Sequence, residues 1–120
     1  MRTKPKKIIV VEDDPALQHA MELIFERGGY DVSILATGEE ALDPTLALPD
    51  IFVLDKQLSG IDGLDICRFL KSQAATADIP VIMLSANPAI GRLSQEAGAT
   101  DFLEKPFKLK NLLELVEKYA

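Results

Sequence analysis

The chain contains four short apolar runs, each followed at once by polar or charged residues. Apolar runs of this length between turn signals are typical of strands that are buried on both faces, as in a parallel sheet covered by helices. A fifth strand is predicted over 30–35, where Val32 and Ile34 fall on one face. The four runs and the residues after them are Ile8–Val11 before Glu12-Asp13-Asp14, Ile51–Leu54 before Asp55, Val81–Leu84 before Ser85, and Phe102–Glu104 before Lys105-Pro106.

Helical patterns alternate with these strands. Asp14 can cap a helix that has Pro15 at its first position, and apolar residues follow at three- and four-residue spacing. A second helix, after Thr37, is expected to be short because Pro44 interrupts its pattern. The predicted helices therefore cover 15–27, a short segment after Thr37, 62–71, 89–97 and 109–119, and the third is expected to bury Ile66, Phe69 and Leu70.

The polar residues that follow the strands are expected to meet. In open α/β sheets, ligands bind outside the carboxyl ends of the strands, so several carboxylates, one hydroxyl and one ammonium would converge there. Two carboxylates about 4 Å apart repel each other by roughly 4 kcal/mol at an effective dielectric near 20. A divalent cation would relieve this repulsion, so the pattern predicts a metal site at that edge.

Composition narrows the class of protein. The chain has 120 residues, 48% of them hydrophobic and 27% charged, which is typical of a globular protein. Its formal net charge of −6 argues against a direct nucleic-acid binder, which would need a basic stripe, so we expect protein partners. A lone cysteine cannot form an intrachain disulfide, and no apolar run is long enough for a membrane span or signal peptide. We therefore expect a cytoplasmic protein that does not contact membranes.

These motifs, in this order, resemble the receiver domain of two-component response regulators from Lys7 to Lys118. The resemblance implies a doubly wound, flavodoxin-like α/β fold with five parallel strands in the order 2-1-3-4-5 and five flanking helices. It also implies one receiver domain over 1–120. The last predicted helix ends the chain, so we expect a stand-alone receiver of the chemotaxis type with no effector domain.

The resemblance implies a Mg²⁺ site, with Mn²⁺ as a substitute. Asp13, Asp55 and the backbone carbonyl of Gln57 match the family's metal ligands. Glu12 matches the other member of the acidic pair that the family has after its first strand, and it would contact the metal either directly or through water. Asp14 is better explained as a helix cap than as a ligand, because Pro15 follows it.

The same resemblance makes Asp55 the phosphoacceptor. A carboxylate is a poor nucleophile unless the phosphoryl charge is neutralised, and a Mg²⁺ ion with a nearby ammonium would supply that neutralisation. Ser85 matches the hydroxyl that bonds a phosphoryl oxygen, and Lys105 matches the ammonium that pairs with Asp55 before phosphorylation and with the phosphoryl group after it. The peptide bond before Pro106 is expected to be cis.

Other positions carry less specific signals. Phe102 matches the family's aromatic switch position, but an aromatic residue on the last strand is also an ordinary core residue, and both interpretations stay open. Gln57 and Asn87 occupy the two variable positions that influence how long the phosphoryl group lasts. Lys56 and Ser59 depart from the family pattern, which commonly has an apolar residue and Pro, respectively, at these positions.

We therefore predict a response regulator receiver that takes a phosphoryl group onto Asp55 from a histidine kinase or histidine phosphotransfer protein. Phosphorylation would change how this chain, expected to be a monomer, binds a downstream protein, and its only catalysis would be its own phosphorylation and dephosphorylation. A phosphorelay intermediate or a phosphate sink is one alternative. A Mg²⁺-dependent phosphohydrolase with an Asp nucleophile is another, although 120 residues leave little room for a substrate pocket.

Overall fold

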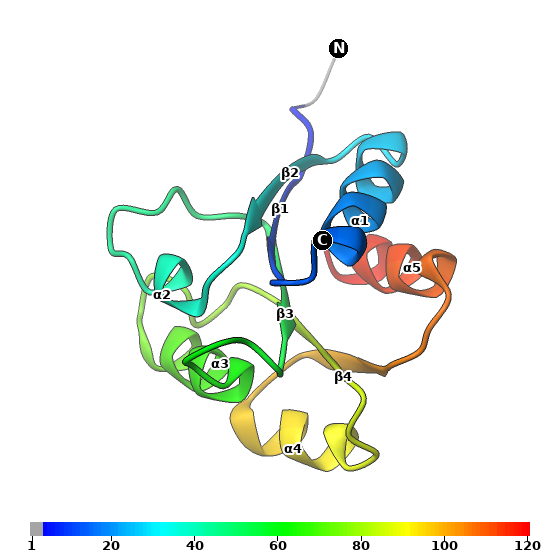
Figure 1. The fold of residues 1–120 in the computed structure, drawn as a ribbon. Helices are drawn as coiled ribbons and strands as arrows, with labels where there is room; N and C mark the ends of the chain where they lie inside the picture. Colours follow the sequence, from blue (N-terminus) through cyan, green and yellow to red (C-terminus); the bar gives the residue numbers. More distant parts are fainter. Residues whose placement is uncertain (1–3) are drawn as a thin grey trace.

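A computed structural model describes residues 4–120 and shows five strands alternating with five helices (Figure 1). The alternation follows the apolar patterns of the sequence, because the strands carry the runs buried on both faces and the helices carry one apolar stripe each. The strands are β1 (Lys7–Val11), β2 (Asp31–Leu35), β3 (Ile51–Asp55), β4 (Val81–Ser85) and β5 (Asp101–Glu104). The helices are α1 (Pro15–Arg27), α2 (Gly38–Ala41), α3 (Gly63–Ser72), α4 (Ile90–Ala97) and α5 (Leu109–Tyr119).

The strands form one parallel sheet in the order β2-β1-β3-β4-β5, which is the doubly wound topology predicted for the chain. The register pairs Val11 with Leu54, Leu54 with Met83 and Met83 with Phe102. These paired strands therefore end at the same level. The strand order reverses beside β1 and β3, and the crevice at such a point is where α/β sheets bind ligands.

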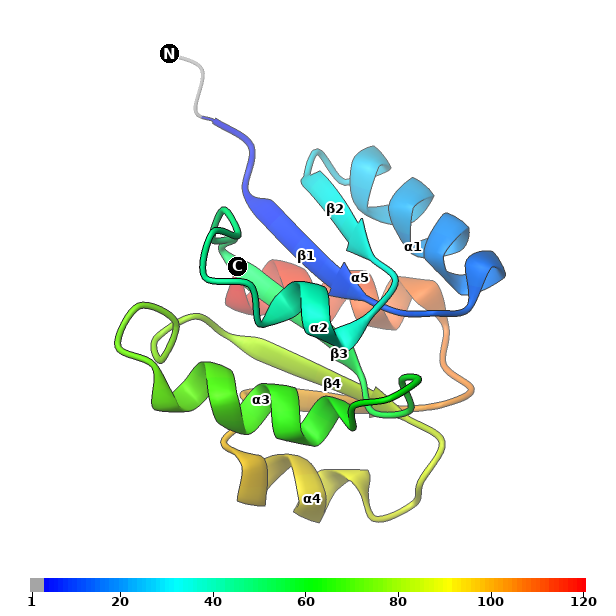
Figure 2. The ribbon, with the colours of Figure 1, turned by 60° about the vertical axis from the view of Figure 1, so that its left-hand side comes forward.

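Helices cover both faces of the sheet, with α1 and α5 on one side and α2, α3 and α4 on the other (Figure 2). Alternate strand residues feed the two cores, since successive side chains of a strand point to opposite faces. Ile9 and Phe52 pack toward α3, whereas Val10 and Val53 pack toward α1 and α5. β3 and β4 are buried along their whole length, so the central strands give the site a rigid base.

Helix α3 differs from its prediction in two respects, its first residue and the exposure of Phe69. Asp62 does not belong to the helix but caps it, because its Oδ1 accepts a hydrogen bond of 2.8 Å from the backbone N–H of Leu64. The prediction that Phe69 is buried is wrong, since its side chain is 40% exposed. The buried stripe of α3 runs through Leu64, Ile66, Cys67 and Leu70. Phe69 instead lines a partly open apolar cavity beside the segment that follows α2.

Cys67 is fully buried in the core on the α3 side of the sheet. Burial raises the pKa of its thiol to about 11, so the side chain acts as a small apolar packing residue. None of the helices described for residues 4–120 has the length and apolar character that crossing a membrane requires.

Candidate functional site at the carboxyl edge of the sheet

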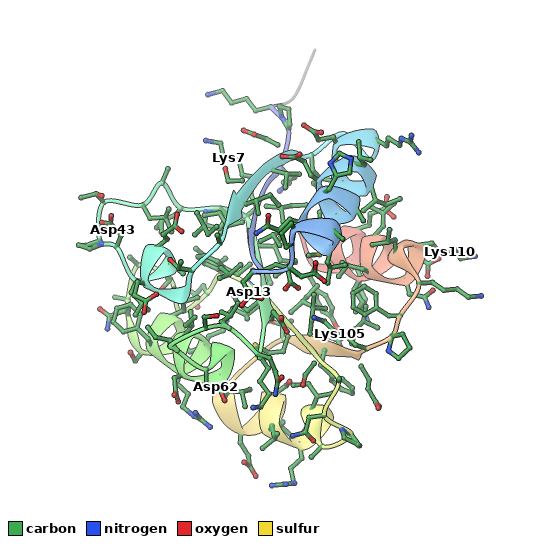
Figure 3. All side chains as sticks on the ribbon, viewed as in Figure 1. Lys7, Asp13, Asp43, Asp62, Lys105 and Lys110 are labelled. Carbon is green, nitrogen blue, oxygen red and sulfur yellow. The ribbon has the colours of Figure 1, made fainter. Side chains whose placement is uncertain are left out.

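Four polar side chains come together where the strands end. Asp13 follows β1, Asp55 and Ser85 are the last residues of β3 and β4, and Lys105 follows β5. Because the strands are parallel and in register, these positions lie at one edge of the sheet. Figure 3 shows Asp13 and Lys105 near the middle of the view, although they come from opposite ends of the chain.

The acidic side chains form a compact cluster. One carboxylate oxygen from each of Glu12, Asp13 and Asp55 can be chosen so that all three lie within 4.8 Å of one another. Glu12 and Asp55 are only 1% and 3% exposed, whereas Asp13 is exposed to solvent. The cluster is therefore anchored in the fold on one side and open to an incoming ion on the other.

Lys105 places a single positive charge beside the two buried acids. Its Nζ lies 3.2 Å from Oδ2 of Asp55 and 3.4 Å from Oε1 of Glu12. The peptide bond between Lys105 and Pro106 is cis, which is the isomer that the resemblance implied. The cluster contains three carboxylates, and this one ammonium pairs with two of them, so the site retains excess negative charge.

The electrostatic strain of this arrangement appears at Glu12. Burial, followed by the neighbouring charge of Asp55, raises the pKa of Glu12 to about 7, although the backbone N–H of Asp14 and the ammonium of Lys105 act in the opposite direction. A buried carboxylate next to another acid is stabilised by an added cation. Carboxylate oxygens are the ligands that Mg²⁺ prefers, so the residues present fit a magnesium ion.

The loop between β3 and α3 closes over the acidic cluster. The backbone N–H of Gln57 donates to Oδ1 of Asp55 at 3.3 Å. Ser59 donates two bonds, from its N–H and its hydroxyl, to Oδ2 of Asp13, each 3.3 Å long. Lys56 pairs with Asp62 at 2.9 Å. Lys56 and Ser59 depart from the family pattern, but their partners could not be predicted from the sequence, because both partners depend on the path of the loop.

The backbone just after β4 holds the hydroxyl of Ser85, the last residue of that strand. Ser85 is 1% exposed, and its Oγ accepts a hydrogen bond of 3.0 Å from the backbone N–H of Asn87. The side chain of Asn87 is exposed, and its Oδ1 accepts a bond of 2.9 Å from the N–H of Ala89. The side chain of Gln57 is also exposed. Gln57 and Asn87 thus present exposed side chains on the loops that follow β3 and β4.

Phe102 does not occupy a core position, which was one of its two predicted roles. Its ring is 40% exposed, so the core interpretation is wrong. The ring lies against helix α4, where a Cβ atom at Gly91 would come within 3.0 Å of it. Glycine at this position lets the tip of the aromatic ring come close to the helix, on the surface formed by α4 and β5.

Comparisons with known proteins agree with this geometry. The family model of the response regulator receiver domain matches residues 8–117. The DNA-binding response regulator MtrA of Mycolicibacterium smegmatis is 36% identical over 116 residues, which cover 94% of this chain and 50% of MtrA. A Chloroflexus aurantiacus J-10-fl protein assigned as a response regulator is 34% identical, with a TM-score of 0.91 and coverage of 97% of this chain and 98% of that chain.

A third similar protein has been solved with a metal ion in its site. The receiver domain of the sensor histidine kinase PA1611 from Pseudomonas aeruginosa PAO1 is 29% identical and has a TM-score of 0.86, with coverage of 96% of this chain and 97% of that chain. Its crystal structure contains a magnesium ion coordinated in the active-site cleft. The donor set of Glu12, Asp13 and Asp55 is chemically suited to the same ion.

The comparisons correct the prediction about partners. The exclusion of nucleic acid is not supported, because relatives such as MtrA are DNA-binding regulators. The chain spans about half the length of the curated relatives it matches. A net charge of −6 on these 120 residues says nothing about the charge of the rest of such a protein. The same fact removes the basis for expecting that no effector domain follows.

Proposed function

This chain belongs to the response regulator receiver domain family, and on that premise we propose that it accepts a phosphoryl group on Asp55 from the phosphohistidine of a histidine kinase. The observation that carries the proposal is the convergence of Asp13, Asp55, Ser85 and Lys105 at one edge of the sheet. The 120 residues would form one receiver domain that acts in the cytoplasm. Receiver domains are signalling domains, and this one would catalyse only its own phosphorylation and dephosphorylation.

Asp13, Asp55 and the backbone carbonyl of Gln57 would hold Mg²⁺, with Glu12 directly or through water, and Mn²⁺ could take its place. The bound ion would neutralise charge on the phosphoryl oxygens. Lys105 already lies 3.2 Å from Oδ2 of Asp55, so it is within reach of a phosphoryl group on that residue. With the ion bound, the site would offer the phosphoryl group two positive charges, that of Mg²⁺ and that of Lys105.

The reaction would be an in-line transfer. A carboxylate oxygen of Asp55 attacks phosphorus, a new O–P bond forms, and the P–N bond to the histidine breaks, with the imidazole leaving. Lys105 would then pair with the phosphoryl group instead of the carboxylate. Ser85 would turn its hydroxyl from the N–H of Asn87 toward a phosphoryl oxygen. Each step exchanges one contact of the unphosphorylated site for another.

The exposed residues around the site would set how long the phosphoryl group lasts on Asp55 and how a protein partner binds. Gln57 and Asn87 lie on the loops that flank Asp55, where their side chains can influence attack by water. Phe102 would carry the change at Ser85 outward, because it sits on the strand next to β4 and is exposed against α4. The surface around Phe102 is where binding of a protein partner would then change.

The proposal is tested by phosphorylating the 120-residue chain with acetyl phosphate. With Mg²⁺ we expect intact-mass analysis to show the addition of one phosphoryl group, and with excess EDTA we expect none, because the carboxylates then lack the neutralising ion. Labelling that proceeds equally well in EDTA would contradict the metal-dependent mechanism.

Removal of the Lys105 charge should strengthen Mg²⁺ binding. The ammonium competes with a cation for Glu12 and Asp55. The measured net contribution of an ion pair with a partly exposed lysine is about 1 kcal/mol at most, or roughly fivefold in affinity. We therefore expect Lys105→Met to bind Mg²⁺ about fivefold more tightly in a calorimetric titration. Lys108→Met, which removes an exposed lysine at the start of α5, is the control. Unchanged or weaker binding by Lys105→Met would show that the ammonium does not compete.

A further inference from the structure

Each of the three clustered acids has partners in the fold, but these partners differ. Glu12 and Asp55 share the ammonium of Lys105. Within residues 4–120, the hydrogen bonds to the side chain of Asp13 come from Ser59, through both its N–H and its hydroxyl. Asp13 is exposed, so without these bonds its carboxylate would be free to rotate in solvent.

Both bonds from Ser59 end on the same oxygen of Asp13. They occupy Oδ2 and leave Oδ1 as the oxygen that can turn to a cation. A hydrogen-bonded ligand is already oriented, so less conformational freedom is lost when the metal binds. Proline, which is frequent at this position in the family, has neither an N–H nor a hydroxyl and could not make either bond.

Lys56 anchors the loop that carries Ser59. Its partly buried ammonium pairs with Oδ2 of Asp62, while Oδ1 of Asp62 caps helix α3. The carbonyl of Lys56 also accepts a bond of 2.9 Å from the N–H of Gly63. The two ends of the loop are therefore tied together, and the turn inside it uses Gly60 with a φ of 89°, a conformation that favours glycine.

We propose that Ser59 is a positioning residue for Asp13, and that the Lys56–Asp62 pair holds the loop so that Ser59 reaches it. This inference rests on the proposed function, because it assigns a role toward the metal that the proposed reaction needs. Lys56 and Ser59, which depart from the family pattern, thereby act together. They hold the exposed ligand of the magnesium site, Asp13, in place before the ion binds.

The test measures Mg²⁺ binding by the full 120-residue chain. The chain has no tryptophan, so the titration is followed by amide NMR shifts and by calorimetry. Residues that orient a metal ligand typically change affinity by about 10–100-fold, and the exposure of this contact places it at the lower end. We expect Ser59→Pro, which removes both donors, to weaken binding about tenfold, and Ser59→Ala, which removes one, about threefold.

Matched variants separate positioning from stability. Ser59→Thr keeps both donors and should bind Mg²⁺ like the parent chain. Ser72→Ala removes an exposed serine hydroxyl that bonds the carbonyl of Phe69 on α3, and it should leave the affinity unchanged. Lys56→Met should weaken binding by less than Ser59→Pro, because it loosens the loop without removing the donors. The thermal midpoints of Ser59→Ala and Ser59→Thr should stay close to that of the parent.

The outcomes distinguish this inference from the proposed function. If the parent chain binds Mg²⁺ and the Ser59 variants bind it equally or more tightly, the positioning role is overturned while the proposed function stands. If Ser59→Thr fails to bind like the parent, the role of the hydroxyl is likewise overturned. If the parent chain itself binds no Mg²⁺, the proposed function and this inference fail together.

Discussion

Replacement of Asp55 by asparagine should abolish phosphorylation of the chain. Asn has nearly the same shape, so the fold and the packing around this 3% exposed position should survive. An amide lacks the anionic oxygen that attacks phosphorus, and in this site it also loses the charge that pairs with Lys105 at 3.2 Å. We expect the incorporation of phosphoryl groups from acetyl phosphate with Mg²⁺ to fall to background in intact-mass analysis.

The same strand supplies the control for this variant. Asp50 directly precedes β3 at its amino end, where its carboxylate accepts a hydrogen bond of 2.7 Å from the N–H of Lys7. Asp50→Asn makes the same chemical change at the opposite end of the strand and should be phosphorylated like the parent chain. Undiminished labelling of Asp55→Asn would move the phosphoacceptor to another residue and remove the basis of the proposed function.

Gly63→Ala should strongly destabilise the protein. A Cβ atom at this position would lie 2.0 Å from the carbonyl oxygen of Asp55 and 2.9 Å from Cα of Lys56. Both neighbours are backbone atoms, one of the last residue of β3 and one of the first residue after it, so they cannot move aside as a flexible side chain could. The start of α3 would have to shift away from the end of β3. Overpacking of this kind costs about 2–4 kcal/mol, which urea unfolding followed by circular dichroism can measure.

Gly29→Ala is the comparison for Gly63→Ala. Gly29 has a φ of 89°, but no atom lies within 4 Å of the Cβ that alanine would add. Its cost is therefore the backbone strain alone, about 1–2 kcal/mol. A Gly63→Ala protein no less stable than Gly29→Ala would show that the approach of α3 to β3 is not as close as described. The closeness matters for the candidate site because the same contact holds the backbone of Asp55 and Lys56 against the start of α3.

Net charge was a poor guide to partners. The value of −6 describes 120 residues, but MtrA, a DNA-binding regulator, is about twice as long as its matching region. Charge is informative about the surface of the residues that are counted, and it carries no information about a region outside them. The charge of this chain therefore gives no reason to exclude nucleic acid as a partner of a longer protein.

The sequence by itself determined the strands, their parallel arrangement and the identity of the residues at their carboxyl ends. Apolar runs of four residues between turn signals are typical of strands buried on both faces, as in a covered parallel sheet, and such a sheet brings its strand ends to one edge. For that reason Asp13, Asp55, Ser85 and Lys105 could be named in advance, although Glu12 and Lys105, which form an ion pair, are 93 residues apart.

The tertiary structure alone decided which atoms those residues meet. The bonds of Ser59 to Asp13 and the pair of Lys56 with Asp62 depend on the path of one loop. The exposure of Phe69 and Phe102 depends on how far neighbouring segments extend over each helix and strand. Periodicity reports which face of an element is apolar, but contact distances and burial arise only when separate elements pack together.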